Sequence, residues 1–295
     1  MLRMRTERRL CSIAASLPLI LVLAIQNLSA QNQVPSTQPG WPCVAGRAID
    51  PVYVQTAEAT GGQVFLFDRT EAARSLVLVQ HSHKHNETIF RSTGTLMTGS
   101  REFNFPVDST VESLMLSVTL QCLQSITVYR PSNTDVHSGE PDVDDNVFRS
   151  GRILILTKPP AGPWRIRIAG AGLFFVTVQT KSSISLDRAE FVEPGGRIGH
   201  EGLFPVKGAM HPGERRTLAL AITAPAGEAA FRLLNSAGEA LDQLEVQASS
   251  EGPDDREFLA TFPLRRADFR VAVEGRDSAG YPYQRVLPRL FQIRD

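Results

Sequence analysis

The sequence predicts a mainly β fold: two tandem β-sandwich domains that follow a short segment of helix and strand. From about Phe90 onward, apolar and polar residues alternate with a period of two, which is typical of half-buried strands. Glycine, proline and asparagine separate these runs at intervals typical of a sandwich rather than of βαβ units. Apolar residues make up 42% of the chain, which is enough to fill substantial cores.

The first 30 residues have the composition of a secretory signal. Four arginines lie among the first nine residues, an almost wholly apolar run covers residues 13–25, and Ala30 supplies a small residue before a cleavage point. We predict export, with cleavage after Ala30. The alternative is an uncleaved membrane anchor, although the run is short for a bilayer span. No second run of spanning length follows, so we expect a secreted or periplasmic/extracellular protein with no membrane span after cleavage.

The next segment changes from a leader to helix and strand. Residues 31–49 are rich in proline and polar residues and are predicted to be a flexible leader. Asp50 and Pro51 are suited to cap and begin a helix over residues 50–60. A strand is predicted over residues 63–67. A second helix is predicted over residues 71–80, with these apolar residues near one face: Ala72, Leu76 and Val79.

Residues 89–186 are predicted to form the first sandwich. Trp164 alternates with Ile166 and Ile168 and is expected in its core. The glycines of residues 170–172 are expected to form a turn. The predicted strands cover residues 103–107, 114–120, 126–129, 153–157, 164–168 and 174–179.

Residues 187–295 have the size and rhythm of one immunoglobulin-like or fibronectin-like domain. Residues 193–196 (EPGG) are expected to be a linker or a turn. The predicted strands cover residues 218–222, 230–234, 241–246, 258–262, 269–273 and 283–287.

Three stretches carry a resemblance to a known family, and together the match spans about residues 50–292. Residues 53–65 (YVQTAEATGGQVF) are similar to the last helix-to-strand turn of a von Willebrand A domain. Residues 161–168 (AGPWRIRI) resemble the G-x-W-x-V/I strand of a galactose-binding-like sandwich. Residues 269–286 (FRVAVEGRDSAGYPYQRV) are similar to the final strands of an immunoglobulin-like module. In this order the segments resemble the region after the A domain in hemicentins and related extracellular proteins.

The chain departs from that family at the A domain itself. The metal-binding pattern Asp-x-Ser-x-Ser of an A domain does not occur in this sequence. Residues 50–88 are too short for a complete A domain, so the resemblance implies a helix-strand-helix remnant without its metal site. The resemblance further implies a galactose-binding-like sandwich over residues 89–186 and an immunoglobulin-like sandwich over residues 187–295. A fold name transfers no sugar-binding residues.

Two cysteines remain after the predicted cleavage, Cys43 and Cys122. In an oxidising compartment they are candidates for a disulfide bond. The alternative is one exposed loop thiol and one buried strand thiol, because sequence does not show whether the two residues approach each other.

Two clusters are candidate metal sites. Asp142, Asp144 and Asn146 mimic the start of a calcium loop, in which oxygen ligands alternate along the chain. The usual glycine and the closing glutamate are missing, so the alternative is a solvated hairpin loop. Three alternating histidines would face one side of a strand and are candidate zinc ligands, or else form the polar end of a helix: His81, His83 and His85.

Charge and motifs narrow the function. The 31 basic and 31 acidic residues cancel, which removes the electrostatic footprint of a nucleic-acid-binding protein. The sequence lacks the nucleophile elbow, the zinc-protease motif and the phosphate-binding loop. We therefore expect a secreted, non-enzymatic adhesion, recognition or matrix-type module that binds an extracellular protein or glycan. We expect it to need no cofactor, with calcium as a candidate. The alternative is an exported hydrolase or a carbohydrate-active accessory protein.

Overall fold

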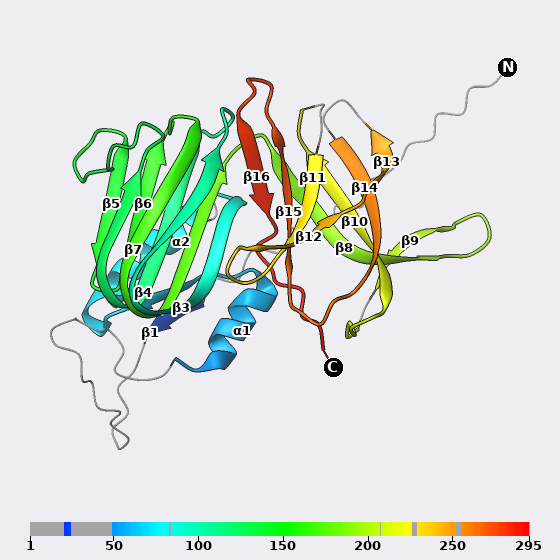
Figure 1. Ribbon diagram of the computed structural model, residues 1–295, viewed down its shortest axis with the longest axis horizontal. Helices are drawn as coiled ribbons and strands as arrows, with labels where there is room; N and C mark the ends of the chain where they lie inside the picture. Colours follow the sequence, from blue (N-terminus) through cyan, green and yellow to red (C-terminus); the bar gives the residue numbers. More distant parts are fainter. Residues whose placement is uncertain are drawn as a thin grey trace.

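The computed structural model describes residues 21–24, 49–82, 84–206, 208–225, 229–251 and 255–294. In this part of the chain three antiparallel sheets dominate and helices are few, so the predicted mainly β fold is confirmed. Figure 1 shows two blocks of strands side by side, with helix α1 beneath the place where they meet. Among the described residues, no helix is long and apolar enough to cross a membrane.

Helix α1 (Pro51–Thr60) and strand β2 (Val64–Phe67) form where the sequence predicts them. The carboxylate of Asp50 caps α1 by accepting a hydrogen bond from the Val52 N–H at 3.0 Å. Gly61 ends the helix in the left-handed conformation, at a φ of 76°. Strand β1 (Leu21–Ala24) pairs with β2 in parallel. The rest of the predicted signal, including Ala30, and residues 31–48 of the leader lie outside the described residues.

The second predicted helix is divided into a 3₁₀ helix, η1 (Arg69–Ser75), and a short α-helix, α2 (Leu76–Ser82). Its buried face also differs from the prediction, because Leu78 is fully buried whereas Leu76 is 60% exposed. A 3₁₀ turn holds fewer residues than an α-turn and rotates the faces of the residues around it. A single helical period across the segment therefore selected the wrong apolar side.

The first sandwich is one strongly bent antiparallel sheet with the strand order β3-β7-β4-β6-β5. A bulge interrupts the pairing of β3 between Leu96 and Gly99, and bulges bend strands. The bend folds β3 over itself, since the rings of Phe90 and Phe103 meet in the core with centroids 5.7 Å apart. Trp164 is fully buried there, as predicted. The strands are β3 (Glu87–Val107), β4 (Ser113–Tyr129), β5 (Val143–Phe148), β6 (Gly151–Thr157) and β7 (Gly162–Lys181).

Strand β7 joins two predicted strands, residues 164–168 and 174–179, through the glycines expected to form a turn. Gly170 has a φ of 146°, and a Cβ atom there would collide with the carbonyl oxygen of Cys122 on β4. These glycines therefore bend a continuous strand instead of ending it. Strand β4 also joins two predicted strands, but through bulges after Leu120 and Leu123 and not through glycines.

The second sandwich consists of two sheets, with the strand orders β13-β14-β10-β8-β9 and β12-β11-β15-β16. Leu220, Phe231 and Phe269 lie in its core. Residues 193–196 form the end of β8 and the start of the hairpin to β9, which is the predicted turn and not a linker. The strands are β8 (Ser185–Gly195), β9 (Gly202–Pro205), β10 (Arg215–Thr223), β11 (Ala229–Leu234), β12 (Ala240–Leu244), β13 (Gln247–Glu251), β14 (Asp255–Pro263), β15 (Arg270–Arg276) and β16 (Pro282–Val286).

The two sandwiches pack directly against each other. The Thr93 N–H of β3 donates to the Ser236 carbonyl oxygen at 2.8 Å, and the Gln284 side chain of β16 donates to the Ile89 carbonyl oxygen at 2.9 Å. The chain passes from one sandwich to the other between the end of β7 and the start of β8. The domain boundary between residues 186 and 187 stays a prediction.

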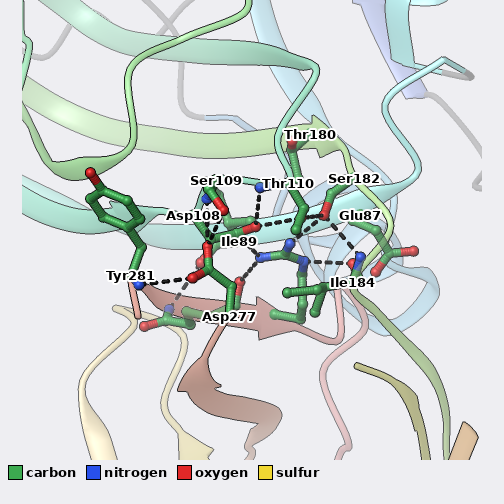
Figure 2. A network of polar contacts seen from close by, with 12 residues as sticks. Glu87, Ile89, Asp108, Ser109, Thr110, Thr180, Ser182, Ile184, Asp277 and Tyr281 are labelled. Atoms are coloured by element: carbon green, nitrogen blue, oxygen red, sulfur yellow. Dashed lines mark hydrogen bonds and ion pairs between the residues drawn. The ribbon is translucent and has the colours of Figure 1, made fainter. Parts of the chain in front are cut away.

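Figure 2 shows a network of buried polar groups that joins the sandwiches. Arg285 of β16 and Asp108, after β3, form an ion pair at 2.8 Å with both side chains fully buried. Beside it, Asp277 accepts hydrogen bonds from the N–H and the hydroxyl of Ser109 at 2.7 and 2.6 Å. Burial acts to raise the pKa of Asp277, but these donors and two N–H groups of its own turn outweigh burial and lower the pKa. Asp277 is therefore ionised at neutral pH.

A second buried ion cluster brings α1 into the junction. One carboxylate oxygen of Glu58 lies 3.0 Å from the Arg91 guanidinium of β3, and the other pairs with Arg270 of β15. The three side chains are 7%, 3% and 1% exposed, in the order Glu58, Arg91, Arg270. Burial lowers the pKa of each arginine to about 10, which leaves both charged at neutral pH. Glu58 therefore connects the two sandwiches through ionised groups.

Candidate functional site

A polar cleft opens on the first sandwich where β4 extends beyond β6. Strand β6 pairs with residues 113–119 of β4, so among the described residues the stretch 123–127 pairs with β7 on one side and with no strand on the other. The resulting cleft has a volume of about 540 Å³. We call it the β4 cleft; it is lined by residues 123–127 and 135–138, by Asp145, and by Val147, Phe148, Arg149, Gly151 and Arg152.

A two-point ion pair fixes one wall of the β4 cleft. Arg152 donates from Nε and Nη2 to the two oxygens of Asp145, at 2.7 and 3.0 Å. The Ser138 hydroxyl also donates to Asp145. Burial acts to raise the pKa of Asp145, but the hydrogen bonds from Arg152 and Ser138 outweigh it and lower the pKa. Asp145 is therefore an ionised carboxylate held by two donors, which stabilises the wall and makes the group a weak base.

A second acid–arginine contact holds the loop between β4 and β5. Glu140 accepts a hydrogen bond from the His137 N–H at 2.6 Å and pairs with Arg130 through its other oxygen. The His137 N–H, followed by the Arg130 side chain, lowers the pKa of Glu140. The same loop carries Asp135 and His137 into the lining of the cleft. These contacts fix the loop backbone beside the cleft.

Arg149, in the turn between β5 and β6, adds a cation to the lining of the cleft. Its guanidinium lies 3.1 Å from Asp68, and its N–H donates to the Glu71 carboxylate at 3.1 Å. Helix η1 thus supports the turn, while the Arg149 side chain remains 66% exposed. The β4 cleft therefore offers a cation, hydroxyls and amide groups to a polar ligand.

The predicted calcium ligands lie beside the cleft, and Asp142 has a different partner from Asp144 and Asn146. Asp144 and Asn146 alternate on β5, where the Asn146 amide donates to Asp144 at 3.0 Å. Asp142, just before β5, lies 3.8 Å from the Arg130 guanidinium. In the part of the chain that the structure describes, no group of three or more His, Cys, Asp or Glu side chains is placed to hold a metal ion. Calcium binding by Asp142, Asp144 and Asn146 stays a prediction.

The predicted histidine cluster lies at the end of α2. The rings of His81 and His85 have centroids 6.3 Å apart, and His83 lies outside the described residues. One ring nitrogen of His85 lies 2.7 Å from the His81 carbonyl oxygen and the other 2.8 Å from the Ser113 hydroxyl. Because both ring nitrogens of His85 have partners, the geometry favours the polar helix end over a zinc site.

Cys122 lies on β4 next to the β4 cleft and is disulfide-bonded. It is the one cysteine among the described residues, so its partner lies outside them. The pairing of Cys122 with Cys43 stays a prediction.

Sequence reasoning missed the arginines that shape the cleft, Arg130, Arg149 and Arg152. It assigned the nearby acids to a metal, because acids at alternate positions are visible in the sequence. An ion pair between residues on the two sides of a turn is not visible there. A hairpin signal was nevertheless present in the sequence, since Ser150-Gly151 is a dipeptide typical of turns and lies at the short turn between β5 and β6. Assigning that hairpin would have placed Asp145 and Arg152 on neighbouring strands.

Comparison with known proteins identifies the first sandwich. Residues 88–183 match the family model described as hemicentin galactose-binding domain-like. These residues coincide with strands β3 to β7, so the resemblance is confirmed for this part of the chain. The matching residues include neither 53–65 nor 269–286, on which the rest of the resemblance depends.

No curated protein sequence matches this chain. Among solved structures, the chain is similar to the crystal structure of Bacillus licheniformis lipase BlEst2 in propeptide form, at 12% sequence identity and a TM-score of 0.30. The likeness covers 68% of this chain and 40% of that chain. A TM-score this low supports no inference about fold or activity.

Proposed function

We propose that this protein is an exported, non-enzymatic recognition module of the adhesion or matrix type, and that the β4 cleft binds its glycan or protein partner. The proposal rests on the cleft. It has a volume of about 540 Å³ and lies beside the stretch of β4 that pairs on one side only, on the sandwich that matches the galactose-binding-like family. Recognition sites are usually concave and built on a rigid scaffold. The disulfide-bonded Cys122 supports export, because disulfides persist mainly in oxidising compartments.

The chemistry of the cleft favours binding over catalysis. A serine nucleophile requires an adjacent base. Ser138 instead donates to Asp145, whose lowered pKa and ion pair with Arg152 make it a poor proton acceptor. The acids and histidines that a hydrolase could use have other partners, since Asp142 lies beside Arg130 and both ring nitrogens of His85 have partners.

The remaining segments support a tandem extracellular architecture. With β8 taken as the first strand, the orders β13-β14-β10-β8 and β12-β11-β15-β16 correspond to the D-E-B-A and C′-C-F-G orders of an immunoglobulin-like sandwich. The helix-strand-helix order of residues 50–88 supports their origin as a remnant of a von Willebrand A domain. The buried ion clusters at Glu58 and Asp108 would hold the two sandwiches as one rigid spacer and platform.

A glycan and matrix-protein array tests the proposal. The mature chain is applied with calcium and with a chelator, together with the variants Arg149→Glu and Arg188→Glu. The two arginines are matched controls, because each is an exposed cation about 3 Å from a carboxylate, but only Arg149 lines the β4 cleft. We expect a specific signal that Arg149→Glu weakens about tenfold or more, the scale of one charged hydrogen bond, and that Arg188→Glu retains.

Three outcomes bear on the finer parts of the proposal. Loss of the signal on chelation would support calcium at Asp142, Asp144 and Asn146. Equal binding by Arg149→Glu and the wild type would exclude the β4 cleft as the site. Turnover of an ester or glycoside that one polar substitution abolishes would establish the hydrolase alternative instead.

A further inference from the structure

Two adjoining cavities lie on the second sandwich next to the end of α1. Their volumes are about 340 and 290 Å³, and they share four lining residues: Gly208, Met210, Arg289 and Phe291. Because they share these residues, we treat them as one site and call it the Arg289 groove. Most of its lining comes from residues 205, 206, 208–210, 289–292 and 294, none of which lines the β4 cleft, so the two sites are separate.

Arg289 is held in a fixed orientation in this groove. One terminal nitrogen donates to the Ala189 carbonyl oxygen at 2.6 Å, and the guanidinium carbon lies 4.7 Å from the centroid of the Phe291 ring. Phe291 in turn stacks on Phe269 with centroids 5.3 Å apart. A guanidinium carries five N–H donors in a planar fork, and one bond to a carbonyl leaves most of them available. Arg289 is therefore a pre-positioned donor.

Among the described residues, no carboxylate forms an ion pair with Arg289. The carboxylate of Glu190, which lines the same groove, interacts with Arg289 electrostatically and lies 3.5 Å from Arg188. Arg216, also in the lining, is paired with Glu214 at 2.9 Å. Arg294 adds a second cation that has no ion pair in the described part of the chain. Three arginines and one glutamate line the groove, so its lining carries the net positive charge that an anionic group requires.

The rest of the groove is largely apolar. A carboxylate fits a planar guanidinium in a two-point contact, and aliphatic surface gains free energy when it is buried against apolar side chains. The groove therefore suits a ligand that combines the two. The apolar lining includes Ala59, Pro205, Val206, Met210, Leu290 and Phe291.

We propose that the Arg289 groove binds a carboxylate carried on an aliphatic body, with the carboxylate on Arg289 and the aliphatic part against the Met210 side of the groove. This site goes beyond the proposed recognition function, because it lies on the other sandwich and would take a different ligand. Its failure would leave the β4 cleft unaffected.

Titration calorimetry of the mature chain with sodium octanoate tests the proposal. The variant is Arg289→Gln, and the matched control is Arg276→Gln. Arg276 also donates to one backbone carbonyl, that of Gly280 at 2.8 Å, and has no ion pair among the described residues, but it lines neither cavity. We expect saturable binding of one octanoate, about tenfold or more weaker in Arg289→Gln and unchanged in Arg276→Gln.

Further arms separate the parts of the ligand. Acetate lacks the aliphatic body and 1-octanol lacks the charge, so both should bind more weakly than octanoate. Should Arg289→Gln not fold, as judged by circular dichroism, Arg289→Lys keeps the charge, loses the planar fork and should also weaken binding. The proposal is wrong if octanoate does not saturate, if the Arg289 and Arg276 variants behave alike, or if glucuronate binds as tightly as octanoate.

Discussion

Replacing Glu58 by glutamine tests whether the two sandwiches are held as one unit by buried charge. The substitution preserves the shape of the side chain and one oxygen acceptor for Arg91 and Thr93, which lie 3.0 Å from Glu58. It removes the one negative charge that contacts both Arg91 and Arg270. Those arginines are 3% and 1% exposed and remain charged at pH 7, since their pKa values are about 10.

The expected loss follows from burial. Removing one partner of a buried ion pair costs about 3–5 kcal/mol, because the remaining charge stays buried without compensation. That loss is a large fraction of the stability of an ordinary domain, about 5–15 kcal/mol. The control is Glu239→Gln, which breaks an ion pair of 3.1 Å between Arg101 of the first sandwich and Glu239 of the second. Glu239 is 65% exposed, so its loss should cost about 0–1 kcal/mol.

The assay is equilibrium unfolding in urea at pH 7, followed by circular dichroism and by tryptophan fluorescence. Trp164, one of the two tryptophans of the chain, lies in the core of the first sandwich, so a shift of the fluorescence transition is expected if the junction stabilises that sandwich. A Glu58→Gln variant that unfolds within 1 kcal/mol of the wild type would refute the reasoning. An equal loss in Glu239→Gln would refute it as well, because burial would then not decide the cost.

Three further predictions concern other groups of the chain. The pKa of Asp277 is lowered in the folded protein, so its contribution to stability is present above the ordinary value of 3.8 and is lost as the pH falls through the lower folded value. The melting temperature of Asp277→Asn should therefore depend less on acid pH than that of the wild type. Burial raises the pKa of Glu87 above 4.5, so the ionised group costs stability as the pH rises through the raised value. The melting temperature of Glu87→Gln should be higher than that of the wild type at pH 7 and equal to it near pH 4.5. A lower melting temperature of the variant at pH 7 would contradict this. Peptide mapping should find Cys43 joined to Cys122, and reducing the bond should cost about 2–4 kcal/mol; a Cys122 peptide joined to another cysteine would exclude the pairing.

The sequence predicted the architecture where the period of apolar residues is directly visible. The alternation around Trp164 and the spacing of turns after Phe90 were sufficient to identify a mainly β fold. The same reasoning failed where a glycine bends a strand instead of ending it, as Gly170 does, because both uses require the same residue type. It also failed at Leu76, where a 3₁₀ turn displaces the helical period.

The site was harder to predict because its contacts join distant parts of the chain. The acids near Asp145 were visible as a cluster, but their pairing with Arg152 depends on a hairpin that had not been assigned. Glu58 and Arg270 are separated by most of the chain, and neither residue type nor spacing indicates that they meet. Such pairings become visible only once the sandwiches are placed against each other.

Hydrogen exchange of the mature chain, measured with and without the strongest array ligand, tests the role of the β4 cleft most directly. We predict slower exchange at residues 123–127 and in the turn around Arg149, with exchange in the second sandwich unchanged. Protection confined to the second sandwich, or chemical conversion of the ligand during the measurement, would contradict the account.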